Sequence, residues 1–226
     1  MSTKSIFQAA AAVAIFAALS STAQAAATYC KPLSTNAAGM KLSDVTFSGN
    51  TPTTSADDCY GLVAGNDSAG INGLNLTWGT DWTFLVKDES GPAATGTFLN
   101  IKYSLDGYTP TTSGSWTLTA TATAPATLPV FVDFVAVLKS STDYALWFFD
   151  DVKVDGSDGG TWQSVFTNVK NDGTVTFQNL SHMSLYIRAG RDPSDPPVLI
   201  PEPAGIALVG LALAAAGLSS RRKRAA

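Results

Sequence analysis

Residues 130–138, with the sequence VFVDFVAVL, and residues 144–149, with the sequence YALWFF, decide the fold class of this 226-residue chain. Both runs are apolar throughout, apart from Asp133. No long segment of the central part of the chain repeats its apolar residues with the period of 3.6 that marks an amphipathic helix. A run such as 130–138 is typical of a central strand that is covered on both faces of its sheet.

The segments around these two runs alternate between apolar and polar residues, as strands with one buried face do. The apolar members of two such segments are Leu99, Ile101, Tyr103, Leu105, Trp116, Leu118 and Ala120. Residues 183–187 mark a last strand that ends before Gly190. Turn signals lie between the strands: Ser90-Gly91-Pro92, Asp106-Gly107, Ser113-Gly114, Asp155-Gly156, Asp158-Gly159-Gly160 and Asn171-Asp172-Gly173. Short strands at this spacing predict an all-β fold, an antiparallel β-sandwich or jelly roll.

The first 25 residues have the layout of a secretory signal peptide. Lys4 provides a positive start, residues 6–19 are apolar except for one glutamine, and Ala23 and Ala25 are the small residues that signal peptidase requires. We expect cleavage after Ala25, with Ala27 as a second choice. An uncleaved anchor is the alternative, but the apolar stretch is short for a membrane span.

The C-terminal 26 residues combine a Pro-Glu-Pro motif, an apolar segment and a basic end. The motif is Pro201-Glu202-Pro203, residues 204–218 carry no charge, and the cationic residues are Arg221, Arg222, Lys223 and Arg224. As a helix, residues 204–218 would extend roughly 22 Å, so we expect a transmembrane helix over about 204–220. The positive-inside rule then keeps the basic tail cytoplasmic and places the preceding body outside the membrane.

This tail closely resembles the PEP-CTERM sorting signal of Gram-negative bacteria, through Pro201, Glu202, Pro203 and residues 221–224. The resemblance implies that exosortase, a membrane-embedded thiol protease, cuts near the Pro-Glu-Pro motif. It further implies a cell with an outer membrane and, usually, an exopolysaccharide or biofilm matrix. A buried core helix, a glycolipid-anchor signal and a wall-sorting signal are alternatives that the basic end or the missing Leu-Pro-x-Thr-Gly motif disfavours.

A fainter resemblance, to one uncharacterised group of PEP-CTERM ectodomains, extends through the body of the chain. It is carried by Cys59-Tyr60-Gly61, Gly65-Asn66, Gly114-Ser115-Trp116, Val137-Leu138-Lys139 and residues 180–186. It supports a single fold and transfers no site.

Together, these features divide the chain into a signal peptide (1–25), a β-sandwich ectodomain (26–190), a stiff Pro/Asp linker (191–200) and the sorting signal (201–226).

The part of the chain between the two sorting segments, which we call the exported body, is acidic and contains both cysteines. Without the two sorting segments, nine cationic and seventeen acidic residues remain, a net charge of −8. Such an acidic surface does not favour binding to nucleic acid, which is also negatively charged. Cys30 and Cys59 are the only cysteines, and in an oxidising compartment an even pair predicts a disulfide. Two cysteines and a single histidine do not make a structural zinc site, because such a site needs four ligands.

The sequence contains no recognisable catalytic motif or cofactor-binding motif, and we expect a protein that is not an enzyme and needs no cofactor. The single histidine, His182, should lie on the same strand face as Ser184 and Tyr186, as a structural or surface residue. A pair of aspartates as a glycosidase dyad stays open, because nothing in the sequence selects one.

Two weaker signals concern ligands. Asp150, Asp151, Asp155 and Asp158 crowd a Gly-rich segment, and their oxygens suit Ca²⁺, although the spacing is not that of an EF-hand. Trp78 and Trp82 flank residues 79–81, so we expect them near a loop and exposed, where aromatic faces can contact glycans. Core packing is the alternative for both tryptophans.

These observations lead to three functional hypotheses. The first is a structural protein of the cell surface or extracellular matrix that is associated with exopolysaccharide or biofilm. Signal peptidase and exosortase would process it, and the C-terminal helix would anchor it transiently in the inner membrane before release to the outer envelope or the medium. The second hypothesis is a carbohydrate-binding module, and the third is a secreted glycoside hydrolase.

Overall fold

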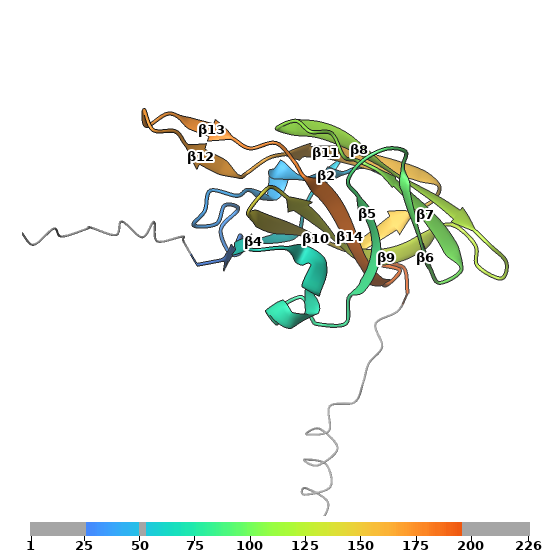
Figure 1. Ribbon diagram of the computed structural model, residues 1–226. Coiled ribbons are helices and arrows are strands. Elements are labelled where there is room, and N and C mark those ends of the chain that lie inside the picture. The colour runs from blue at the N-terminus through green and yellow to red at the C-terminus, as the bar shows by residue number, and fades with distance from the viewer. Residues whose placement is uncertain (1–25, 50–52, 196–226) are drawn as a thin grey trace, which may run out of the picture.

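The computed structural model describes residues 26–49 and 53–195, which form two antiparallel sheets packed face to face (Figure 1). In the larger sheet the strands lie in the order β1 (Thr28–Tyr29), β4 (Asp58–Ala64), β10 (Asp143–Val154), β9 (Val130–Lys139), β14 (His182–Ala189) and β5 (Thr83–Asp88). In the smaller sheet they lie in the order β11 (Ser157–Gln163), β8 (Ser113–Ala122), β7 (Ile101–Asp106) and β6 (Ala94–Phe98). The predicted all-β, antiparallel class is therefore confirmed.

Two small hairpins and three 3₁₀ turns complete the described elements. The hairpins are β2 (Thr46–Phe47) with β3 (Thr54–Ser55), and β12 (Thr167–Val169) with β13 (Val175–Phe177), which projects from the body at the upper left of Figure 1. The turns are η1 (Leu42–Asp44), η2 (Asp67–Ala69) and η3 (Asn72–Leu74). Within the described ranges, no helix has the length and apolar character needed to cross a bilayer.

The main core fills the space between the two sheets. Trp116 of β8 meets Phe134 of β9 edge to face, with ring centroids 5.9 Å apart, and Phe134 stacks on Phe149 of β10 at 4.6 Å. Most of the alternating residues predicted to face inward do so, namely Ile101, Tyr103, Leu105, Trp116, Leu118 and Ala120, which are all buried in this core. Alternation places every second side chain of β7 and β8 in the interior, and burial of these apolar groups drives the packing of the sheets.

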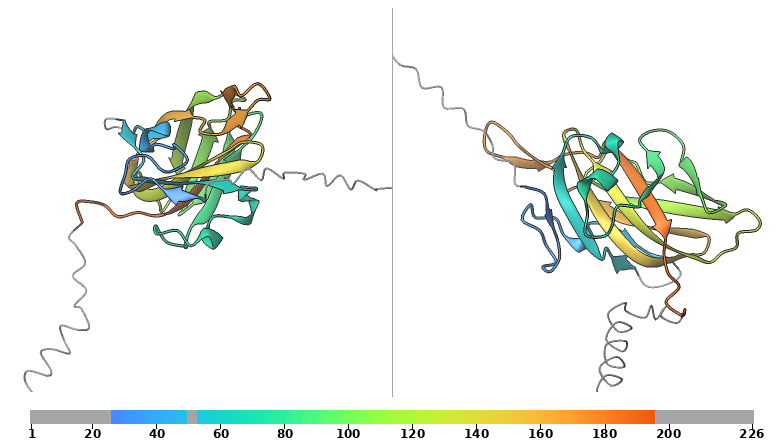
Figure 2. Two further views of the ribbon diagram at one scale, coloured as in Figure 1. Left: turned by 90° about the vertical axis from the view of Figure 1, so that its left-hand side faces the viewer. Right: turned by 90° about the horizontal axis from the view of Figure 1, so that it is seen from below.

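A second apolar cluster covers the outer face of the larger sheet. Val135, Val137 and Phe148 point away from the main core and pack against residues 65–82, the segment that contains η2 and η3. Seen from below, this segment lies over the larger sheet (Figure 2, right), where its buried side chains share one cluster with residues of β9, β10 and β14. The apolar run at 130–138 thus has cover on both faces, as its composition predicts.

Three details differ from the sequence-based expectations. Leu99 is 54% exposed, because it lies with Asn100 in the tight turn between β6 and β7, where both residues have positive φ. Ser113-Gly114 begins β8 instead of forming a turn. Gly159-Gly160 belongs to β11, where a Cβ at Gly160 would lie 1.8 Å from the carbonyl oxygen of Thr46. These two glycines therefore permit close strand packing instead of marking a turn.

Candidate functional site

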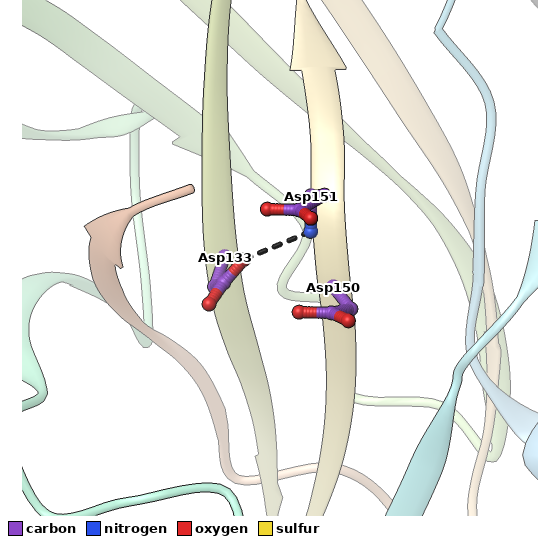
Figure 3. Close-up of side chains that lie close together, drawn as sticks. All are labelled: Asp133, Asp150 and Asp151. Atoms are coloured by element: carbon purple, nitrogen blue, oxygen red, sulfur yellow. Dashed lines mark hydrogen bonds between the residues drawn. The ribbon is translucent and has the colours of Figure 1, made fainter. Parts of the chain in front are cut away.

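Three carboxylates gather where β9 and β10 pair irregularly. Asp133 comes from β9, and Asp150 and Asp151 come from β10, with one oxygen of each within 4.8 Å of the others (Figure 3). The register of the two strands shifts between Phe149 and Val152, which is the mark of a β-bulge. The bulge interrupts the alternation of β10, so two consecutive aspartates approach Asp133.

Asp133 is the buried member of this carboxylate group, and both of its oxygens have partners. Oδ1 accepts a hydrogen bond from the Asp151 backbone N–H at 2.8 Å, and Oδ2 accepts one from Arg188 Nε at 2.7 Å. The guanidinium of Arg188 thereby compensates the charge of Asp133. Burial, followed by the charges of Asp133, Asp151 and Asp57, raises the pKa of Asp150.

An open pocket of about 390 Å³ lies beside the carboxylate group, and Asp57, Asp150 and Asp151 line it together with Phe47 and Phe131. Asp57 Oδ2 accepts a hydrogen bond from the Asp150 backbone N–H at 2.9 Å, which joins β10 to the residue before β4. Carboxylate oxygens in such a pocket accept hydrogen bonds from ligand hydroxyls. A carboxyl group with a raised pKa close to further carboxyl groups is also the kind of pairing that glycoside hydrolysis uses.

Trp78 and Trp82 lie in the loop segment 65–82, but the prediction that their faces are exposed is wrong. They are 8% and 4% exposed. Trp78 stacks on Phe148 with ring centroids 5.2 Å apart, and the guanidinium carbon of Arg188 lies 4.3 Å from the centroid of Trp82. The outer face of β10 is apolar, so these two rings cover it and are not available to sugar rings.

His182 lies with Ser184 and Tyr186 on one face of β14, as predicted from alternation, and all three side chains bind Asp67. The Nε2 atom of His182 is 2.9 Å from Asp67 Oδ1, and the Ser184 hydroxyl donates to Oδ2 at 2.8 Å. Burial disfavours ionised Asp67, but the hydrogen bonds from His182 and Ser184 outweigh it and lower the pKa of Asp67. Ser184 donates to the carboxylate and not to the imidazole, so this arrangement anchors η2 and does not form a nucleophile–base pair.

The four aspartates proposed for calcium do not form one site. Asp150 and Asp151 belong to the carboxylate group with Asp133, whereas Asp155 and Asp158 flank the turn between β10 and β11. The expectation of one loop fails because β10 continues to Val154, which puts roughly 13 Å of extended chain between Asp151 and Asp155.

The predicted disulfide is present, between Cys30 after β1 and Cys59 in β4, and both residues are fully buried. The other predicted functional positions lie outside the described residues. They are Ala23, Ala25, Pro201, Glu202, Pro203, Arg221, Arg222, Lys223 and Arg224.

Sequence reasoning did not select Asp57, Asp67, Asp133 or Arg188 as site residues. Asp133 had a usable signal, because a single charge inside an otherwise apolar strand needs a buried partner. The other three have no local signal, since their partners lie 55 to 119 residues away along the chain. Comparisons with protein-family models, with curated proteins and with solved structures find no match to this chain.

Proposed function

We propose that this chain is an exported, non-enzymatic protein of the cell surface or extracellular matrix that associates with exopolysaccharide. In this proposal residues 1–25 are a signal peptide, residues 204–220 are a temporary membrane anchor, and exosortase processes the Pro-Glu-Pro signal. The observation that carries the proposal is the Cys30–Cys59 disulfide, because such bonds persist in oxidising, extracytoplasmic compartments. The net charge of −8 in the exported part agrees with a soluble body that does not bind anionic polymers.

Mass spectrometry of the protein from its host tests this proposal. We expect the N-terminus at Ala26 or close to it and a C-terminus near residues 201–203, with the disulfide oxidised. Replacing Pro201 and Pro203 by Ala should retain the tail and leave the protein in the inner membrane. The matched control is Pro193→Ala, which changes a proline in the linker and should be processed normally. An intact 226-residue chain in the cytosol with reduced cysteines would exclude the proposal.

A second candidate function is carbohydrate binding, and the observation that favours it is the open pocket lined by Asp57, Asp150 and Asp151. Its carboxylates can accept hydrogen bonds from neutral sugar hydroxyls, and Phe131 provides an apolar wall. This role does not depend on Trp78 or Trp82, which are buried.

Titration of the purified protein and its variants with the exopolysaccharide of its host tests whether the pocket is a glycan-binding site. If the pocket binds glycan, the double substitution of Asp57 and Asp151 by Asn should weaken binding at least tenfold, because it removes two acceptors. Asp172→Asn in the exposed turn of the β12–β13 hairpin is the control. Binding that is absent, or that is unchanged in the double variant, excludes the pocket as the glycan site. Release of new reducing ends during the titration would indicate a hydrolase instead.

A further inference from the structure

The cover of the larger sheet leaves a second open pocket, of about 440 Å³, between η2 and the outer faces of β14 and the edge strand β5 (Figure 1). Residues 67–70 form one wall. Paired residues of the two strands form the floor, Tyr186 with Phe84 and Ser184 with Lys87. No residue lines both this pocket and the one beside the carboxylate group. Concave sites of this size with apolar and polar walls are the usual places where proteins bind small ligands.

Phe84 gives this pocket an aromatic wall. Its side chain is 53% exposed, although it belongs to a strand of the larger sheet. The ring meets Tyr186 edge to face, with ring centroids 5.5 Å apart, and the hydroxyl of Tyr186 donates to the carbonyl oxygen of Asp67 at 3.1 Å. A buried and hydrogen-bonded neighbour therefore positions the Phe84 ring, while much of its surface stays open to a ligand.

Hydrogen-bonding groups border the same space. Each oxygen of the Asp67 carboxylate takes part in one hydrogen bond, which leaves further lone pairs on both oxygens. Lys87 Nζ lies 2.6 Å from Glu89 Oε2, and the remaining N–H groups of its ammonium are available to a ligand. The exposed hydroxyl of Ser68 can both donate and accept.

This set of groups excludes two classes of ligand. A purely apolar ligand would bury the carboxylate of Asp67 and the ammonium of Lys87 without new hydrogen bonds, which is unfavourable. An anionic ligand would find no unpaired positive charge, because Lys87 is the only cation among the described residues that line the pocket, and Glu89 already pairs with it. The pocket therefore suits an uncharged ligand that has an apolar face and hydroxyl groups around it.

We propose that this pocket binds a short segment of a neutral glycan. A sugar ring would lie against Phe84, and its hydroxyl groups would bond to Asp67, Lys87 and Ser68. Sugar hydroxyls suit these partners because each can donate to the carboxylate and accept from the ammonium. The inference rests on the proposed association with exopolysaccharide and adds a contact site to it, and it does not depend on the pocket beside the carboxylate group.

Calorimetric titration of the full-length protein, with its disulfide formed, tests the proposal. The probes are the neutral hexasaccharides of glucose, galactose and mannose and the anionic hexasaccharide of galacturonic acid. At least one neutral probe should bind, and the anionic probe should bind at least tenfold more weakly. Phe84→Ala should weaken binding of the neutral probe at least tenfold, because the sugar ring loses its apolar wall. Phe177→Ala is the matched control, since this ring is also 53% exposed but lies on β13, and binding should not change.

Lys87→Met provides a second test, because it removes the ammonium and keeps most of the apolar stem. It should weaken binding by about threefold to tenfold. Glu89→Gln is its control, since it breaks the same ion pair but leaves the ammonium in place, and it should not weaken binding. The proposal is overturned if no neutral probe binds, or if the anionic probe binds as tightly as the neutral ones. Normal binding by Phe84→Ala or Lys87→Met, or an equal loss in either control, overturns it too.

The exopolysaccharide of the host separates a failure of this site from a failure of the proposed function. If it binds the unsubstituted protein and Phe84→Ala equally well, the association stands and only this site is wrong. If the unsubstituted protein binds neither the probes nor the exopolysaccharide, the association is wrong as well.

Discussion

The outer faces of the two sheets differ in what covers them. The outer face of the larger sheet is apolar, and residues 65–82 pack over it with Trp78 against Phe148. The outer face of the smaller sheet is open to solvent and carries hydroxyl groups, among them Thr117 and Thr119 of β8. The comparison shows that the pattern within a strand reports how many of its faces are covered, because only an apolar residue gains free energy from leaving water.

The covering segment is held by polar anchors as well as by its apolar rings. Asp67 receives hydrogen bonds from β14, and Arg188 joins Asp133 of β9 to Asp81 and to the carbonyl oxygen of Trp78. These contacts satisfy polar groups that the cover would otherwise bury without partners. Substitutions on the covered face should therefore change the stability of the protein more than substitutions on the open face.

Trp78→Ala should remove most of the apolar cover and destabilise the protein by roughly 3–5 kcal/mol, because it leaves a cavity over Phe148. Urea unfolding measures the change. A loss below about 1 kcal/mol would mean that residues 65–82 add little to the stability of the larger sheet.

Asp67→Asn should cost about 1–3 kcal/mol, because an amide cannot accept both hydrogen bonds from His182 and Ser184. The pKa of Asp67 is lowered from 3.8 in the folded protein. Its contribution is therefore complete well above pH 3.8 and is lost as the pH falls below that value toward the lowered pKa. Urea unfolding between pH 7 and pH 3 should show a gap between the two proteins that narrows below about pH 4. A gap that does not change with pH would contradict this role.

Asp150→Asn should stabilise the protein at pH 7 by less than about 1 kcal/mol, since Asp150 is exposed and solvent screens the repulsion from Asp133, Asp151 and Asp57. A raised pKa means that the ionised form is less favourable in the folded state, so the gain should vanish as the pH falls below the ordinary range of an aspartate. Chemical unfolding at pH 7 and pH 4 checks both the gain in stability and its decrease at low pH. A variant that is less stable than the unsubstituted protein at pH 7 would be inconsistent with the repulsion.

Thr119→Ala on the open face of β8 should change the free energy of unfolding by no more than about 0.5 kcal/mol, because its side chain is exposed. It is the counterpart of Trp78→Ala on the other outer face. A loss as large as that of Trp78→Ala would indicate that the smaller sheet is also covered, for example by a second copy of the chain.

Much of the fold could be predicted because it depends on patterns within single strands. The runs at 130–138 and 144–149, the alternation at Ile101–Asp106 and the disulfide between the only two cysteines all appear in the structure as expected. Errors arose where one residue type has two uses. Glycine forms turns but also permits close packing, as at Gly160, and tryptophan binds ligands but also fills cores, as at Trp78.

The sequence by itself determined the all-β class, the strands buried on both faces and the cysteine pairing, because alternation and composition act over a few residues. Only the tertiary structure decided which segment covers the larger sheet, that Asp133 meets Arg188, and that the buried carboxylate of Asp158 has no hydrogen-bond partner among the described residues. These features depend on side chains that are far apart in the chain and on the order of strands in the sheets. Burial creates the demand for a partner, but the topology determines which residue is close enough to meet it.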